Sequence, residues 1–264
     1  MSGSCPVCGR PTEIYFEATV LKEYRADYFF CRACGLLQSE TPFWLEKAYG
    51  AAIAREDTGL VRRNLRTSRI LVPLLLILFG RKGKYLDVAG GTGLLVRLMR
   101  DSGFNFYWSD KYCANAFARG FERESTSPPF TAVTALEVME HLPDPLAFLR
   151  QALGDAQTRT IIFSTELYRG GRPPRPEDWW YYAFSTGQHV SFYHPRTLRA
   201  MAADLGLRLY LGSGIHMFSD RSLSPAAFRL LTSRLALPLA PALRPFLRSK
   251  TEPDRDPMKE GGES

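Results

Sequence analysis

Short runs rich in β-branched and aromatic residues alternate with runs of helical pattern through the middle of the 264-residue chain. This alternation, over residues 60–220, is typical of a parallel sheet whose strands are joined by crossover helices. With 45% hydrophobic residues, the chain has enough apolar surface for one α/β core and a small appendage. We therefore predict a doubly wound α/β sheet, in which ligands bind at the carboxyl ends of the strands.

The order of the expected elements follows from the same patterns. We predict strands at 84–88, 105–110, 130–136 and 158–165, a hairpin at 207–219, and helices at 92–103, 111–120, 144–154 and 194–206. Asp144 and Pro145 suit the N-cap and the first position of one of these helices. The apolar run at 70–80 has about half the roughly 20 residues that a membrane span needs, so it predicts a buried helix.

A glycine turn follows the first predicted strand, in YLDVAGGTGLL at residues 85–95. A nucleoside triphosphate loop needs a lysine and then Ser or Thr after its last glycine, and two leucines stand there instead. A dinucleotide turn needs a third glycine, where this chain has Val96. The acid Asp110, at the end of the second predicted strand, has a spacing that suits the ribose of a dinucleotide or of S-adenosylmethionine equally well.

The run from Asp87 to Gly93, DVAGGTG, resembles motif I of the class I S-adenosylmethionine-dependent methyltransferases. FTAVTALEVMEHLPDPLAFL, at 130–149, is similar to the strand 4 segment of that superfamily. The resemblance covers residues 60–220 and implies a seven-stranded Rossmann-like sheet. Ala89 stands where the family usually has glycine, and we expect little effect, because alanine tolerates ordinary dihedrals though not positive φ.

The resemblance also implies the cofactor site. Asp87 would face the ammonium end of S-adenosylmethionine, Asp110 would take both ribose hydroxyls, and the end of strand 4 would line the methionine side. The implied cofactor-binding residues are Asp87, Ala89, Gly90, Gly91, Gly93, Asp110, Ala135, Leu136 and Glu137. Because few residues separate Gly120 from Phe130, we expect strand 3 to be a stub near 121–123 and assign no adenine contact.

Four of the five cysteines form two CxxC pairs near the N-terminus, at Cys5, Cys8, Cys31 and Cys34. Four thiolates suit a tetrahedral structural zinc with no open position, and two disulfides or another metal are the alternatives. We expect residues 1–45 to form a zinc-ribbon lobe too small to have a core of its own. The fifth cysteine, Cys113, is expected on a helix as a small buried residue.

Methyl transfer from a sulfonium is an in-line displacement, in which a hydroxyl or carbon acceptor must also lose a proton. His141, directly after strand 4, is the first candidate for the base, the alternatives being a loop contact or a contact with the cofactor carboxylate. His189 resembles a recurrent histidine of related enzymes, and Tyr182 completes the catalytic candidates. We expect His194 to cap a helix and His216 to be structural.

Residues 179–182, WWYY, follow strand 5, where this fold places acceptor-recognition loops. They would either form an aromatic wall for a sugar ring or flat acceptor, or pack as a lid on their own domain.

An all-cysteine ribbon before such a domain resembles bacterial sugar and small-molecule methyltransferases, which implies a small-molecule or glycan acceptor. The net charge of +7 and the basic run at 62–84 leave rRNA or tRNA methylation as an alternative partner class. The sequence ALEVMEH after strand 4 differs from the Asn/Asp-Pro-Pro-aromatic motif of base methyltransferases. A non-catalytic cofactor-binding interaction module is the second alternative.

The flanking segments complete the organisation. MSGSCPVCGR lacks the apolar core of a signal peptide, so we expect a cytoplasmic protein. Residues 46–83 would be a helical linker leading into the first strand, with the methyltransferase domain at 84–220. Residues 221–248 would form a helical extension that packs on the body or, through 224–248, contacts a membrane surface. The tail at 249–264 is expected to be disordered.

Overall fold

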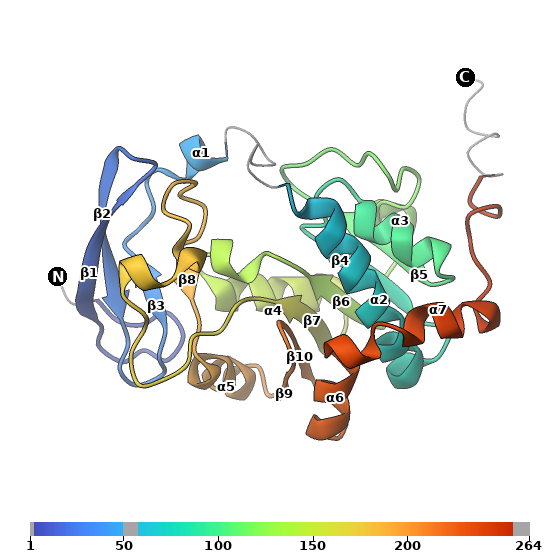
Figure 1. The fold of residues 1–264 in the computed structure, drawn as a ribbon. Helices are drawn as coiled ribbons and strands as arrows, with labels where there is room; N and C mark the ends of the chain where they lie inside the picture. The colour runs from blue at the N-terminus through green and yellow to red at the C-terminus, as the bar shows by residue number, and fades with distance from the viewer. Residues whose placement is uncertain (1–2, 50–57, 256–264) are drawn as a thin grey trace.

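A computed structural model describes residues 3–49 and 58–255 of the chain. Figure 1 shows two sheets, one in an N-terminal lobe and one in the main body, with β8 of the lobe beside the end of the central sheet. The central sheet has the order β5-β4-β6-β7-β10-β9. Its strands are β4 (Lys84–Val88), β5 (Asn105–Ser109), β6 (Ala132–Ala135), β7 (Thr160–Ser164), β9 (Arg208–Leu211) and β10 (Ile215–Ser219).

The first four strands of this order run parallel, and β10 runs antiparallel to both its neighbours. The doubly wound α/β sheet and the hairpin are therefore confirmed. Among the described residues the central sheet has six strands rather than the seven expected. Beside β5, where a third strand was expected as a stub, a single parallel bridge joins Trp108 to Glu122. The short connection before Phe130 leaves no length for a longer strand.

Helices cover both faces of the sheet because its strands are apolar on both faces. In β7, Ile161 and Phe163 belong to one hydrophobic cluster and Ile162 to the other. Helices α4 and α5 contribute to the first cluster, and α2, α3, α6 and α7 to the second. The helices are α1 (Leu45–Ala48), α2 (Leu60–Phe79), α3 (Leu94–Asp101), α4 (Pro145–Asp155), α5 (Pro195–Asp204), α6 (Pro225–Leu231) and α7 (Leu239–Leu243).

Six single-turn 3₁₀ helices complete the elements. They are η1 (Arg123–Ser125), η2 (Met139–His141), η3 (Pro176–Asp178), η4 (Trp180–Tyr182), η5 (Arg234–Ala236) and η6 (Arg244–Phe246). As predicted, Asp144 caps α4 by accepting from the Ala147 amide, and His194 caps α5. The apolar run at 70–75 is buried within α2.

The predicted helix at 111–120 is wrong, because this segment forms bends and turns. Asp110 accepts from the amides of Tyr112 and Cys113, and Asn115 accepts from that of Ala118. Such local side-chain to backbone bonds compete with helical ones. Cys113 is therefore partly buried in a loop rather than on a helix.

The lobe sheet contains β1 (Glu13–Val20), β2 (Tyr24–Phe30), β3 (Leu37–Ser39) and, from much later in the chain, β8 (Ser191–Phe192). Leu37 pairs with Phe192 in this sheet. Aromatic side chains from both parts of the chain share one hydrophobic cluster: Tyr28, Phe30, Trp44, Tyr168, Tyr181, Tyr182 and Phe192. The expectation of a lobe confined to 1–45 and without its own core is therefore wrong.

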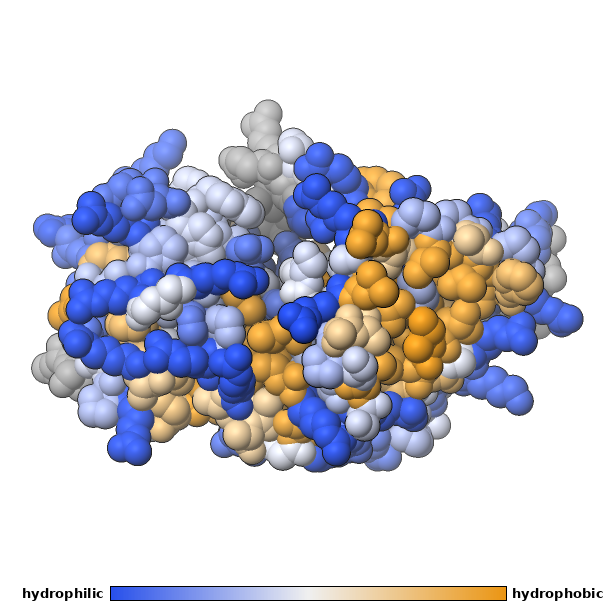
Figure 2. Space-filling view, turned by 60° about the horizontal axis from the view of Figure 1, so that its bottom comes forward, coloured by the Kyte–Doolittle hydropathy of each residue, from blue (hydrophilic) through white to orange (hydrophobic). Residues whose placement is uncertain are grey.

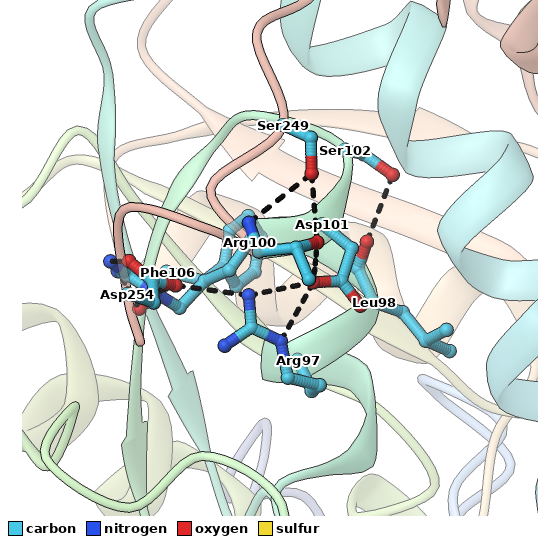
Figure 3. Close-up of polar contacts among 9 residues, drawn as sticks. Arg97, Leu98, Arg100, Asp101, Ser102, Phe106, Ser249 and Asp254 are labelled. Carbon is cyan, nitrogen blue, oxygen red and sulfur yellow. Dashed lines mark hydrogen bonds and ion pairs between the residues drawn. The ribbon is translucent and has the colours of Figure 1, made fainter. Parts of the chain in front are cut away.

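The segment after residue 249 is anchored in the part that the structure describes. Asp254 is buried and accepts hydrogen bonds from Arg100 at 2.6 and 2.7 Å and from Arg97 at 2.9 Å. Figure 3 shows this ion pair, and Lys250 donates its amide to the Arg100 carbonyl at 3.1 Å. The predicted disorder is wrong for 249–255, and 256–264 lie outside the described residues.

The helical extension packs on α2 through α6, η5 and α7. Apolar side chains still gather over these elements, as the orange region in Figure 2 shows. The exposed ones are Val61, Leu65, Ile77, Leu230, Leu235, Leu239 and Phe246. Of the helices described, none is long and apolar enough to cross a membrane.

Candidate functional site

The glycine turn joins β4 to α3 through three residues at positive φ, namely Ala89 at +54°, Gly91 at +56° and Gly93 at +82°. Gly93 is the N-cap of α3. The assumption that Ala89 keeps ordinary dihedrals is wrong, because this alanine occupies the left-handed region. A non-glycine residue there costs about 1–2 kcal/mol, so the turn is strained at the position where the family usually has glycine.

Asp87 ends β4 in a buried position, with its carboxylate accepting from the Thr134 hydroxyl at 2.5 Å. Burial raises the pKa of Asp87 to about 7; the Thr134 hydrogen bond opposes this rise, and the charge of Asp110 adds to it. A Cβ at Gly90 would lie 2.8 Å from an Asp87 carboxylate oxygen. A larger residue at position 90 would therefore displace the Asp87 carboxylate, and a cation beside Asp87 would stabilise its charged form.

Asp110 lies at the end of the neighbouring strand and accepts from the Gly91 amide at 2.8 Å. The Trp108 indole donates to the Gly91 carbonyl, also at 2.8 Å. A Cβ at Gly91 would meet nothing within 4 Å, so a ligand can approach this backbone. The structure thus brings together Asp87, the glycine turn and Asp110.

The end of β6 contributes less than expected. Ala135 is fully buried in one hydrophobic cluster, and Leu136 is partly buried and packs against the other. Glu137 is exposed at a φ of +57°, and its amide donates to the Ser164 hydroxyl, which in turn donates to its carboxylate. Of the three implied residues, Glu137 alone has an exposed polar side chain.

His141 and His189 lie side by side, with ring centroids 4.9 Å apart and planes at 86°. His141 ends η2, in the loop that follows β6, and His189 precedes β8. The His189 Nδ1 donates to the Tyr181 carbonyl at 2.7 Å, and the His141 Nδ1 lies 2.9 Å from the Tyr49 hydroxyl. The structure therefore pairs the two predicted catalytic histidines.

Burial favours the neutral form of both imidazoles. Burial lowers the pKa of His141 to about 3, with the charge of His189 lowering it further and a backbone hydrogen bond to Gln188 opposing. Burial also lowers the pKa of His189. Neutral imidazoles keep one ring nitrogen free to accept a proton or a metal ion.

The third catalytic candidate lies elsewhere. Tyr182 is buried in the lobe core and donates its hydroxyl to the Pro174 carbonyl at 2.7 Å. Its neighbour Tyr181 contacts His189, with ring centroids 4.7 Å apart. Of WWYY, Trp180 alone is strongly exposed, so most of this stretch packs as a lid on the lobe rather than as a wall.

Sequence reasoning missed Tyr49, Tyr181 and Glu140 as neighbours of the histidine pair. Glu140 adjoins His141 in the 130–149 segment, and this adjacency was the available signal. Tyr49 comes from the N-terminal part of the chain and stacks on Tyr112 at 5.7 Å. No local pattern connects Tyr49 to His141.

The four cysteines of the two CxxC motifs lie together in the lobe. Cys5 and Cys34 Sγ lie 3.5 Å apart, as do Cys8 and Cys31 Sγ, and all four sulfurs lie within 4.8 Å of one another. All are free thiols rather than disulfides. The arrangement fits the tetrahedral four-sulfur geometry of structural zinc. Thr197 at the start of α5 donates to the Cys34 carbonyl, which joins the cluster to the main body.

Several solved methyltransferases resemble the chain. The magnesium protoporphyrin IX methyltransferase of Synechocystis PCC 6803 with bound SAM is 16% identical over 67% of this chain and 89% of that one, with a TM-score of 0.44. An O-methyltransferase family protein from Burkholderia thailandensis is 15% identical over 70% and 64%, with a TM-score of 0.49. The methyltransferase domain of a bacterial Hen1 is 17% identical over 60% and 99%, with a TM-score of 0.40.

No curated protein sequence matches the chain. The family model described as "Methyltransferase domain" matches residues 61–211, which is more than half of the chain and spans the glycine turn and both histidines. The chain therefore belongs to the methyltransferase-domain family and is a class I S-adenosylmethionine-dependent methyltransferase.

Proposed function

We propose that the enzyme methylates a hydroxyl group of a small-molecule or glycan acceptor by in-line displacement. The observation that carries this proposal is the pair of neutral imidazoles, His141 and His189, just beyond the carboxyl end of β6. Because β6 pairs with β4, opposite Asp87, the imidazoles follow the strand adjacent to the glycine turn. A proton acceptor thus lies next to the edge of the sheet where this fold binds its ligand.

In this proposal, the glycine turn and the two acids hold the cofactor. Asp87 pairs with the ammonium group, and Asp110 binds the ribose while its bond to the Gly91 amide keeps the turn in place. Ala89, Gly90 and Gly93 shape the turn, and the end of β6 provides Ala135 and Leu136 as backbone contacts and Glu137 as a side chain. The open approach to Gly91 supports this assignment.

The imidazoles remove the proton from the acceptor. The Tyr181 carbonyl holds the His189 Nδ1–H, so the lone pair of this neutral ring is on Nε2. As the hydroxyl proton passes to an imidazole, the acceptor oxygen bonds to the methyl carbon. The carbon–sulfur bond breaks with its electron pair left on sulfur, which gives a methyl ether and neutral S-adenosylhomocysteine.

We also propose that the four-cysteine cluster binds a structural zinc ion. The four sulfurs would be its only ligands, so it would take no part in methyl transfer. Zinc would hold the first and second cysteine pairs together and fix the lobe on α5. Since cysteines remain reduced thiols in the cytoplasm, we place the protein there.

RNA methylation is a second candidate, favoured by one observation. A cavity of about 440 Å³ at the lobe is lined by Phe30, Arg32, Gly170, Gly171, Arg172 and Arg196. Its three guanidinium groups suit a phosphate. Arg62, Arg66 and Arg69 are also exposed along α2 and form a second basic patch that a polynucleotide could contact.

Labelled S-adenosylmethionine and separate pools of sugar nucleotides, lipids and RNA test the two candidates. The proposal expects label in a small-molecule or glycan product, with Asp87→Asn and His189→Asn each lowering turnover at least about tenfold. Label only in RNA would establish the second candidate instead. His194→Asn is the matched control, because asparagine also caps helices and His194 lies at the N-terminus of α5.

A further inference from the structure

We propose that Glu140, His141 and His189 form a binding site for a divalent transition-metal ion, separate from the four-cysteine cluster. One ligand atom from each residue lies within 4.8 Å of the others. Two imidazoles and one carboxylate are a ligand set used for Zn²⁺, Fe²⁺ and related ions, with further positions left for water or substrate. The role of this ion rests on the proposed function, but the existence of the site does not.

The carboxylate of Glu140 supplies an independent observation. Glu140 is 1% exposed, and its Oε2 has no hydrogen-bond partner among the described residues. A buried polar atom without a partner is costly, and a buried charged one more so. A cation between Glu140 and the imidazoles would satisfy this oxygen.

The two imidazoles are already oriented as metal ligands. Ligand histidines almost always bond through their second nitrogen to a carbonyl, a carboxylate or water. Here the His189 Nδ1 donates to the Tyr181 carbonyl at 2.7 Å, which leaves Nε2 as its lone-pair nitrogen. The His141 Nδ1 lies 2.9 Å from the Tyr49 hydroxyl, a partner for this second nitrogen when Nε2 binds an ion in place of its contact with the Gln188 backbone.

Backbone hydrogen bonds join the two segments that carry the three ligands. Val190 donates its amide to the Glu140 carbonyl at 2.8 Å, so the residues directly before β8 are fastened to η2. The Val190 carbonyl in turn accepts from the amide of Ser39, the last residue of β3. The ligand atoms thus come from two segments joined by a backbone hydrogen bond, one of which leads into a strand of the lobe sheet.

The ion would change how the acceptor is activated. A hydroxyl bound to a divalent ion loses its proton more readily. Its proton would pass to water, its oxygen would attack the methyl carbon, and the sulfur would keep the electron pair of the broken bond. With the ion bound, the imidazoles hold it and water takes the proton; without the ion, an imidazole takes the proton, as in the proposed function.

Binding of Co²⁺ tests the proposal, because the absorption spectrum of this ion depends on which atoms bind it. We strip the full-length protein of metal and titrate it with Co²⁺. The expected result is two ions per chain, one with intense sulfur-to-metal absorption and one with weak visible bands only. Glu140→Gln and His189→Asn should each bind the second ion at least about tenfold more weakly and leave the first unchanged.

His194→Asn is the control variant, and S-adenosylmethionine binding by calorimetry shows that each variant is folded. If Glu140→Gln fails to fold, His189→Asn answers the same question. A folded wild-type chain that binds no Co²⁺ with the weak-band spectrum, or binds such an ion that neither variant weakens, would overturn the proposal. Because this readout needs no acceptor, failure of the metal site is distinguishable from failure of the proposed methyl transfer.

Discussion

The ring of His189 meets that of His141 edge to face at 4.9 Å, although the two residues flank strands of different sheets. His141 follows β6 of the central sheet, and His189 precedes β8, which pairs with β3 of the lobe. The N-terminal lobe therefore positions one of the two imidazoles. Unfolding of the lobe should therefore lower turnover more than it lowers the affinity for S-adenosylmethionine.

Removing the zinc we propose for the lobe tests this separation. Cys34→Ser should lower the zinc content by one ion per chain and reduce turnover at least about tenfold, because structural zinc is coupled to folding of the segment it binds. S-adenosylmethionine affinity should change little, since the glycine turn belongs to the other sheet. Elemental analysis and calorimetry measure the two effects. Cys113→Ser, at the cysteine outside the cluster, should alter neither.

Asp87 should make the stability of the cofactor-free protein depend on pH. Its folded pKa of about 7 lies above the ordinary value, so its contribution is present at low pH and is lost as pH rises through 7. The side chain of the Asp87→Asn variant does not titrate. Between pH 5 and 8 the free energy of unfolding of the wild type should therefore fall by roughly 2 kcal/mol more than that of the variant. Urea unfolding at both pH values measures this, and parallel pH curves would contradict it. The same variant should bind S-adenosylmethionine more weakly.

The positive φ of Ala89 predicts opposite effects for two reciprocal substitutions. Ala89→Gly should raise the free energy of unfolding by about 0.5–1 kcal/mol, because glycine adopts this conformation without strain. Gly91→Ala should lower it by about 1 kcal/mol for the same reason. Chemical denaturation measures both variants. A change of the same sign in the two proteins would refute the argument from strain.

The ion pair between Arg100 and Asp254 should contribute measurably to stability. Asp254→Asn leaves the buried Arg100 without its carboxylate and should cost about 3 kcal/mol. The surface pair of Arg150 and Asp204, whose side chains are 57% and 34% exposed, is the matched control. Asp204→Asn should cost less than about 1 kcal/mol. Equal losses in the two variants would show that burial of the C-terminal pair adds nothing.

Local sequence determined the parts of the fold that depend on local chemistry. Alternating apolar runs predicted the parallel sheet and most of its helices, since strand and helix periodicity is read over a few residues. Local patterns also identified the strand that ends near Asp87, the glycine turn and the two CxxC pairs. The failure at 111–120 has a local cause too, because the side chains of Asp110 and Asn115 bond to the backbone there.

Tertiary structure alone decided what meets at the site. Whether His141 faces His189, whether Tyr49 joins them, and whether Asp254 reaches Arg100 depend on pairings between segments far apart in the chain. Such contacts form when distant segments pack together and bury their apolar surfaces, so no short sequence pattern predicts them. The sequence by itself determined the glycine turn and the two CxxC pairs. The acceptor side was decided by tertiary packing, because each of its residues is placed by a different distant segment.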